Sequence, residues 1–527
     1  MVNWKLNFAA NVHGVSDTFS SNIPVIYINT FMTQLRVDSM LDVRFKVIDQ
    51  ITPLRNKAVD STFQYQGHAK IKVRGNYSLN FPQRSYSIEL NDVDGNDTSV
   101  SLGGMPPESD WLLMNTWNDR SFVRNPLMYQ LYQAMGHYAT RFKFCEVFLN
   151  GEYVGIYQLT EKIKRDKNRV DIAKLKDTDL AGDSLTGGYI FKHDYVIDTL
   201  GWLSHVAPPA CNTNFAQYQY VYPSYNNIKL EQAQYIQTFV DTLESRFYGL
   251  NVNDPIMGYR PLIDINSFAD FLILNEFSWN GDGFAKSMNF YKDKNSVDGK
   301  LYAGPVWDFD WALKKMPWIN DSIDVWSYNV PPCNNLQATL PWFSVMMLDT
   351  FFANTVRCRY EYFRNNILST LSINQQIDNN ESILDEAQVR HYNRWPTWGL
   401  SLGTPEQMPY STNMQQELDT MKAMIARRLV WMDLHLPGVC TTPLNVSNTL
   451  MSASMQVYPN PAHTQLTVQS EQPIQQLILY NTMGQCIYQT HGNSHRIYID
   501  ISNVSPGVYL LKTQSGETWY INRVVVE

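Results

Sequence analysis

A β-hairpin is predicted by the stretch Lys143-Phe144-Cys145-Glu146-Val147-Phe148-Leu149, Asn150-Gly151 and Tyr153-Val154-Gly155-Ile156-Tyr157-Gln158-Leu159. Its two arms are rich in the β-branched and aromatic residues that favour strands. Asn-Gly between such runs is typical of a tight turn, because both residues tolerate the positive φ angles that the turn requires. We therefore expect a β-sheet in the first half of the chain.

The segments around the hairpin extend this sheet and add one helix. A helix is predicted over residues 121–135, where apolar residues recur every four positions and Gly136 provides the stop. Four further runs have the composition or the period-two alternation of strands: residues 25–29, 43–47, 68–73 and 187–192.

Residues beyond about 230 are predicted to be mainly helical. An apolar stripe at helical spacing includes Ile236, Val240, Leu243 and Phe247, and it ends before Gly249. Asp264 and Asn266 are candidate caps for the next helix. Later helices are expected over residues 342–369, 374–395 and 411–435. The predicted fold class is therefore α+β, with a β-rich first part and a helical second part.

The composition changes again near residue 440. Residues 441–455 are rich in Thr, Ser, Asn and Met and carry no charge, which is typical of a linker. Residues 456–527 contain short strand-like runs separated by turn residues, the pattern of a small all-β sandwich. We therefore divide the chain into an N-terminal extension (1–23), a main domain (24–440), a linker (441–455) and a C-terminal domain (456–527).

Charge and hydropathy argue against two classes of partner. The formal net charge is −8, and no long basic run is present, which disfavours a nucleic acid. No window approaches 18 consecutive apolar residues, so no membrane span is predicted. The first residues lack the apolar region of a signal peptide, so the chain is either cytoplasmic or a mature form.

The six cysteines show no CxxC pair, which disfavours a zinc ribbon. Cys211 and Cys333 both lie in loop-like segments beside prolines. They are candidates for a disulfide in an oxidising compartment.

The C-terminal domain resembles a type A sorting domain of the type IX secretion system. The resemblance is carried by Tyr458-Pro459-Asn460-Pro461, Asn481-Thr482-Met483-Gly484 and Ser505-Pro506-Gly507-Val508-Tyr509, in this order at the end of the chain. It implies the type IX secretion machinery as a partner, a Bacteroidetes-type bacterium as the source, and a secreted or cell-surface location.

The main domain resembles the CotH kinase family of spore-coat-protein-H-like atypical protein kinases. Many short matches occur in order, among them Arg74-Gly75-Asn76, Leu159-Thr160-Glu161-Lys162-Ile163-Lys164-Arg165-Asp166, Asn280-Gly281-Asp282-Gly283 and Gly304-Pro305-Val306-Trp307-Asp308-Phe309-Asp310. The resemblance implies a divergent protein-kinase-like fold with a β-rich N-terminal lobe and a helical C-terminal lobe. It also implies ATP and Mg²⁺ or Mn²⁺ as cofactors.

Asp282 is the candidate catalytic residue. It lies between two glycines after a predicted helix, and such a backbone presents a carboxylate closely to a ligand. The resemblance places it where the family's catalytic aspartate accepts or orients the proton of the attacked hydroxyl. The alternative is a structural Asx-turn in a glycine-rich loop.

Asp308 and Asp310 are the candidate metal ligands. They form an Asp-x-Asp motif, and hard carboxylate oxygens suit Mg²⁺ or Mn²⁺. Alternatively, Asp310 pairs with a nearby lysine. Asn289, seven residues beyond Asp282, is a third candidate ligand. Trp307 either stacks on the nucleotide base or fills the core.

The sequence departs from the family pattern at the position of the lysine that should bind the phosphates. Relatives commonly carry Pro-Lys-Lys or Pro-Lys-Arg where this chain has Pro82-Gln83-Arg84. Arg84 is the candidate phosphate ligand, although Arg and Lys are not interchangeable. Glu161 is the candidate partner of Arg84, by analogy with the lysine–glutamate pair of kinases. Its alternative is a surface salt bridge with Lys164 or Arg165.

These patterns predict a secreted atypical kinase that transfers phosphate from ATP to Ser or Thr of extracellular or surface proteins. The alternative is a catalytically inactive kinase-fold surface protein that acts as an adhesin or binding module.

Overall fold

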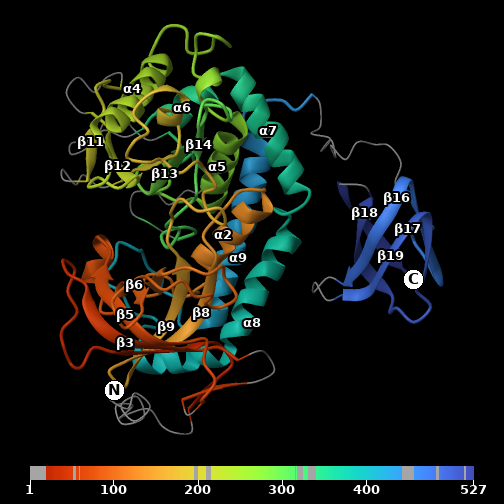
Figure 1. The fold of residues 1–527 in the computed structure, drawn as a ribbon, viewed down its shortest axis with the longest axis horizontal. Coiled ribbons are helices and arrows are strands. Elements are labelled where there is room, and N and C mark those ends of the chain that lie inside the picture. Colours follow the sequence, from red (N-terminus) through yellow and green to blue (C-terminus); the bar gives the residue numbers. More distant parts are fainter. Residues whose placement is uncertain are drawn as a thin grey trace. The chain divides into compact units, whose positions relative to one another are not determined.

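The computed structural model describes residues 19–50, 55–58, 60–194, 200–208, 215–314, 316, 324–329, 340–441, 456–481, 486–515 and 518–527. It divides into two compact units, Met1–Thr441 and Thr442–Glu527, each of which is described by itself (Figure 1). Most of the predicted N-terminal extension and the segment 442–455 lie outside the described residues.

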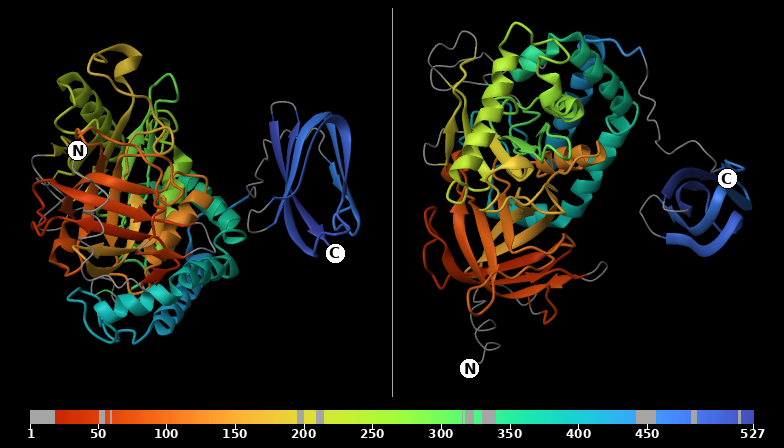
Figure 2. Two further views of the ribbon diagram at one scale, coloured as in Figure 1. Left: turned by 60° about the horizontal axis from the view of Figure 1, so that its bottom comes forward. Right: turned by 45° about the horizontal axis from the view of Figure 1, so that its top comes forward.

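A closed barrel forms one end of the first unit, drawn in red and orange in Figures 1 and 2. β8 closes it by pairing in parallel with β2. A second, small sheet of β1 (Ser20–Ser21) and β4 (Asn56–Lys57) accompanies it. In barrel order the strands are β2 (Val25–Asn29), β3 (Leu41–Ile48), β5 (Tyr65–Arg74), β6 (Ser85–Asn91), β7 (Asp110–Asn115), β9 (Glu152–Glu161) and β8 (Phe142–Leu149).

The predicted hairpin is confirmed and forms part of this barrel. β8 and β9 pair antiparallel as far as Leu149 and Glu152. Asn150 and Gly151 between them have φ angles of 51° and 86°, as a tight hairpin turn with two left-handed residues requires. Inward-facing residues of the barrel, such as Phe45, Trp111 and Tyr157, fill its core.

A five-stranded sheet lies in the other part of the unit. Its order is β11 (Gly201–Leu203), β12 (Gln217–Tyr222), β10 (Tyr189–His193), β13 (Met288–Lys292) and β14 (Leu301–Ala303). The prediction of a mainly helical second part missed β13 and β14. Both strands are short, and both are buried in a sheet whose other strands come from earlier in the chain.

Helices surround this sheet and connect it with the barrel. α5 is buried along its whole length after Asn266 and packs against α2, α7 and α9. α8 extends from the helical part to the barrel, where it packs on β9 (Figures 1 and 2). The helices are α2 (Arg124–Ala134), α3 (Gly182–Leu185), α4 (Leu230–Phe247), α5 (Ile265–Ser278), α6 (Trp342–Met347), α7 (Thr350–Arg364), α8 (Thr370–Arg394) and α9 (Met414–His435), with short 3-10 turns η1 (Tyr77–Asn80) and η2 (Arg260–Leu262).

The helix predicted over 342–369 is two helices, because Asp349 caps a new one. Its carboxylate accepts a hydrogen bond from the Phe351 amide at 3.0 Å, which starts α7 after the end of α6. Asp264 caps α5 in the same way, as expected, by accepting from Ser267.

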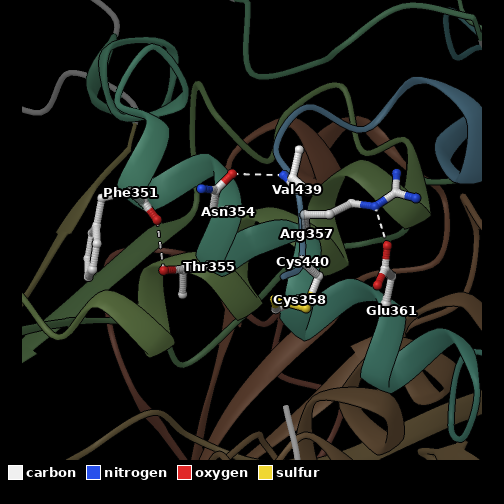
Figure 3. The surroundings of a disulfide bond; sticks show 8 residues. All are labelled: Phe351, Asn354, Thr355, Arg357, Cys358, Glu361, Val439 and Cys440. Atoms are coloured by element: carbon white, nitrogen blue, oxygen red, sulfur yellow. Dashed lines mark hydrogen bonds and ion pairs between the residues drawn. A yellow bond between two sulfur atoms is a disulfide. The ribbon is translucent and has the colours of Figure 1, made fainter. Parts of the chain in front are cut away.

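A disulfide joins Cys358 of α7 to Cys440, beyond the end of α9 (Figure 3). The Asn354 side chain also accepts a hydrogen bond from the Val439 amide at 2.8 Å. The end of the first unit is therefore fixed to α7 at two neighbouring points. The predicted pair Cys211 and Cys333 lies outside the described residues.

The second unit is all-β, as predicted. Where several short strands were expected, residues 465–481 form one long strand, β16, whose register with β17 shifts between Gln469 and Ile474. Leu466, Leu477, Leu511 and Val524 contribute to a separate core. The strands are β15 (Gln456–Tyr458), β16 (Gln465–Asn481), β17 (Cys486–Asp500), β18 (Gly507–Ser515) and β19 (Thr518–Val526).

Candidate functional site

A polar cavity of about 240 Å³ lies within the first unit, where the barrel meets the helical part. The barrel contributes the end of β5, the turn η1 and the start of β6, and α2 contributes Asn125. The five-stranded sheet contributes residues of β10 and β12, and two loops after α5 and β14 complete the wall. The cavity therefore collects side chains from segments far apart in the sequence.

Asp282 lies in the cavity wall on the loop that follows α5. Trp279 ends this helix in the left-handed conformation, with φ 48°. A Cβ atom at Gly283 would lie 2.1 Å from the Asn275 side chain, so this loop requires glycine at that position. Burial raises the pKa of Asp282, and Lys286, 3.8 Å away, opposes this rise. Asp282 is therefore suited to accept a proton.

Asp308 faces the same cavity from the loop after β14. Its φ angle is 69°, a strained value for a residue other than glycine. Three hydrogen bonds maintain the local conformation. Ser287 Oγ donates to Asp308 Oδ2 at 3.2 Å, Asn280 Nδ2 donates to the Asp308 carbonyl at 3.2 Å, and the Phe309 amide donates to Asn125 Oδ1 at 2.7 Å.

Asp310 completes the group of carboxylates. Within the described residues its Oδ1 atom is buried and has no hydrogen-bond partner. Burial raises the pKa of Asp310, and the Lys314 ammonium opposes this rise. Burial also raises the pKa of Asp308 well above its usual value, and the nearby carboxylates of Asp310 and Asp282 add to this effect. The cavity therefore favours a cation that would offset crowded negative charge.

Two buried carboxylates, one of them with an unpartnered oxygen, are a donor set that suits a divalent cation only if a ligand supplies the rest of its coordination shell. In the part of the chain that the structure describes, no three His, Cys, Asp or Glu side chains form a complete metal-binding group. Mg²⁺ typically takes one or two protein carboxylates and completes its shell with water and substrate phosphates. Asp308 and the free oxygen of Asp310 would be the protein ligands in such a shell.

Three cationic side chains line the cavity, and the sequence interpretation assigned a role to none of them. Arg74 stands at the end of β5, with its guanidinium 5.8 Å from the centre of the Trp307 ring. Lys192 pairs with Asp194 at the end of β10, and Lys286 pairs with Asp282. Burial lowers the pKa of Arg74, whereas Asp308 raises it. Arg74 belongs to a matched motif, but the motif alone does not show which way its side chain points.

Four of the seven predicted site residues line this cavity: Asp282, Trp307, Asp308 and Asp310. Trp307 also stacks on Tyr129, with ring centres 6.1 Å apart. Asn289 is buried on β13, where its amide donates to the Pro305 carbonyl at 2.9 Å, and it is not among the lining residues.

Glu161 and Arg84 lie elsewhere. Glu161 is fully buried and accepts hydrogen bonds from the Arg141 guanidinium at 2.7 and 2.9 Å, and Arg169 lies 3.4 Å away. These partners replace the expected pairing with Arg84 and the alternative pairing with Lys164 or Arg165. Arg84 lines a separate hollow on the barrel.

Arg124, at the start of α2, holds the loop that carries the carboxylates. Its guanidinium donates to the carbonyls of Ala312 at 2.8 Å and Leu313 at 3.2 Å. It also pairs with Asp119 at 2.6 Å and with Glu417 of α9 at 2.8 Å. Since Leu313, like Asp308, has a positive φ, these contacts stabilise a strained loop.

Comparison with known proteins matches each of the two units to a protein family. A family model described as CotH kinase protein matches residues 71–432, and one described as secretion system C-terminal sorting domain matches residues 456–527. The chain therefore belongs to the CotH kinase protein family. Its sorting domain routes it through the type IX secretion machinery to a secreted, cell-surface location. Among the described residues, no helix has both the length and the apolar character that crossing a membrane requires.

Other comparisons add little. No curated protein matches the chain. One similar solved structure is PorZ, a bacterial surface component of the type-IX secretion system of Porphyromonas gingivalis. The similarity has 20% identity and a TM-score of 0.13, and it covers 14% of this chain and 11% of PorZ.

Proposed function

We propose that this protein is a secreted atypical kinase that transfers the γ-phosphate of ATP to a Ser or Thr hydroxyl of an extracellular or surface protein. The observation that carries the proposal is the convergence of Asp282, Asp308 and Asp310 with three cationic side chains on one cavity. Phosphoryl transfer requires mainly this: cations on the phosphates, carboxylates for the metal, and a group that orients the hydroxyl.

In this proposal the residues have distinct roles. The acceptor hydroxyl oxygen forms a bond to the γ-phosphorus while the bond to the β–γ bridging oxygen breaks, and ADP leaves with that electron pair. Asp282 takes the hydroxyl proton. Arg74, Lys192 and Lys286 bind the phosphate oxygens. Mg²⁺ or Mn²⁺, when bound by Asp308 and Asp310, supplies further neutralisation of phosphate charge.

Gln83 favours a second candidate function, that of a catalytically inactive surface-binding protein. It occupies a position where relatives commonly carry lysine, yet its side chain is buried and neutral. Its amide nitrogen donates to the Ile156 carbonyl at 2.8 Å, and its oxygen accepts from the Thr116 amide at 3.2 Å. Gln83 therefore supports the barrel and leaves phosphate binding to other residues.

The test is transfer of labelled phosphate from ATP with Mn²⁺ to a generic protein acceptor. We expect Asp282→Asn to reduce transfer by about a hundredfold or more while nucleotide binding persists. Asp308→Asn should lose both transfer and metal-dependent nucleotide binding. Asp298→Asn, on an exposed turn outside the cavity, is the matched control.

The outcomes separate the two functions. Nucleotide binding without transfer in the wild type would favour the inactive protein. Transfer that survives both substitutions would remove this site assignment.

A further inference from the structure

We propose that the hollow around Arg84 on the barrel binds an extended peptide segment of a partner protein, one that carries a carboxylate beside an apolar side chain. This inference does not depend on the proposed kinase activity. It assigns a role to the arginine that the structure places away from the carboxylate cavity.

The hollow has a volume of about 460 Å³ and a lining that is neutral except for Arg84. Met32, Leu35, Val37 and Leu149 give it apolar surface. Thr33 adds a hydroxyl group and Gln34 an amide group, both of which can hydrogen-bond a peptide backbone. A single positive charge in a mixed apolar and amide lining matches a single carboxylate and does not match the several charges of a nucleotide.

Arg84 lacks a carboxylate partner within the described residues. Its side chain is half-buried, yet it makes neither an ion pair nor a hydrogen bond there, whereas Arg36, Arg55 and Arg141, in the segments beside the barrel strands, each pair with an acidic residue. A partly desolvated guanidinium without a partner is unfavourable, and its planar fork matches a carboxylate through two parallel hydrogen bonds. A carboxylate from outside would remove this cost.

One wall of the hollow is a strained turn after β2. Phe31 and Met32 have φ angles of 52° and 62°, two consecutive left-handed residues without a glycine. The two residues are 58% and 83% exposed, respectively. Strained backbone and exposed large apolar side chains both recur where a protein contacts a ligand or partner.

The turn is preformed by contacts with the β8–β9 hairpin. Asn150 Oδ1 accepts a hydrogen bond from the Thr30 amide at 2.8 Å, and Asn150 Nδ2 donates to Thr30 Oγ1 at 3.0 Å. The Thr33 amide donates to the Thr30 carbonyl at 3.0 Å. A preformed wall lowers the entropy lost when a peptide binds.

The experiment measures the binding of fluorescein-labelled hexapeptides to the full-length protein by fluorescence anisotropy. One peptide alternates Glu and Leu, a second replaces Glu by Gln, and a third replaces Glu by Lys. We expect the wild type to bind the Glu peptide about tenfold more tightly than the Gln peptide. Arg84→Met should abolish this difference, and Arg84→Lys should retain part of it.

Three further variants test separately the role of the Arg84 charge, the role of the apolar surface and the independence from the kinase proposal. Lys72→Met removes a positive charge from β5 outside the hollow and should leave the preference intact. Met32→Ser should weaken binding of the Glu and Gln peptides alike. Asp282→Asn should bind peptide normally, so failure of the kinase proposal would not affect this result.

Two results would overturn the inference. One is equal affinity of the wild type for the Glu and Gln peptides, and displacement of both by octanoate would then assign the hollow to a fatty acid. The other is an unchanged preference in Arg84→Met with an unchanged melting temperature.

Discussion

Arg74 illustrates how the position of one side chain changes the interpretation of the site. The resemblance to the CotH kinase family directs attention to Arg84, because it implies a lysine at or beside that position. Arg84, immediately before β6, lines the separate hollow, whereas its neighbour Ser85, the first residue of β6, lines the carboxylate cavity. Successive side chains of a strand point to opposite faces, so a one-residue difference decides which site a charge reaches. Arg74 reaches the carboxylate cavity from the next strand of the barrel.

Arg74→Met is therefore expected to weaken ATP binding, measured by titration calorimetry with Mn²⁺ present. The expected loss is about tenfold to a hundredfold, since a charge-assisted hydrogen bond to phosphate is removed. Arg84→Met serves as the control and should leave ATP affinity unchanged. A larger effect of Arg84→Met than of Arg74→Met would contradict the placement of the phosphates.

The single residue Glu244 on α4 should make the stability of the protein depend on pH. Burial raises its pKa to about 7, although Ser204 and Tyr218 donate hydrogen bonds to it. A carboxyl group whose pKa is higher in the folded state destabilises the fold as pH rises from its unfolded pKa to its folded pKa. Between about pH 4.5 and pH 7 this group should lower the free energy of unfolding by roughly 3 kcal/mol.

Urea unfolding of Glu244→Gln at about pH 5 and pH 8 tests this prediction. The variant should gain stability relative to the wild type as pH rises, and the difference should level off above the folded pKa. Glu231→Gln, on the exposed first turn of the same helix, is the control. A difference that stays constant with pH would contradict the raised pKa.

At the scale of elements, local patterns predicted most of the helices and the hairpin. The apolar stripe of α4, the Asp264 cap of α5 and the Asn150-Gly151 turn depend on neighbours within a few residues. Short strands such as β14 were missed, because their formation depends on partners that arrive from distant segments. The pairing of Glu161 with Arg141 also could not be predicted from their spacing in the sequence, since it depends on how the barrel closes.

The ion pair that joins α5 to α9 also could not be predicted from the sequence, because its two residues are far apart in the chain. Arg428 and Glu276 form an ion pair 2.6 Å apart, and both side chains are 0% exposed. Arg428 also donates to the Glu276 carbonyl at 2.9 Å, near the end of α5 that leads to the Asp282 loop. The pair therefore fixes the helix end from which the candidate catalytic loop starts.

Arg428→Met is expected to destabilise the protein by about 3–5 kcal/mol, because it leaves Glu276 buried without its counter-charge. The neighbouring Arg427→Met is the matched control. Arg427 is 56% exposed and pairs with the partly exposed Asp324, so its loss should cost little. Chemical unfolding of both variants measures the difference, and equal effects would contradict a structural role for the buried pair.

At the scale of the whole molecule, the disulfide at the end of the first unit encloses a long stretch of chain. Cys358 and Cys440 are 82 residues apart in the sequence, so the bond restricts the unfolded chain considerably (Figure 3). The sequence did not indicate this pair, because spacing alone carries no information on Cα distance.

Cys358→Ser is expected to lower the free energy of unfolding of the first unit by about 2–4 kcal/mol. Cys486→Ser removes a free, exposed thiol of the second unit and is the control. The two variants are compared with the wild type by thermal unfolding without reductant. An unchanged transition in Cys358→Ser would show that the contacts of Asn354 and the α9 helix already hold this end of the chain.

The two units should also unfold independently of each other. Each has its own hydrophobic core, and the division falls between Thr441 and Thr442, just beyond the disulfide. A core that is complete within one unit should melt as a cooperative transition of its own. A chain ending at Thr441 should therefore melt at the temperature at which the first unit melts within the full-length protein, although loss of the sorting domain should abolish export. A clearly lower melting temperature of the shortened chain would show that the sorting domain stabilises the first unit.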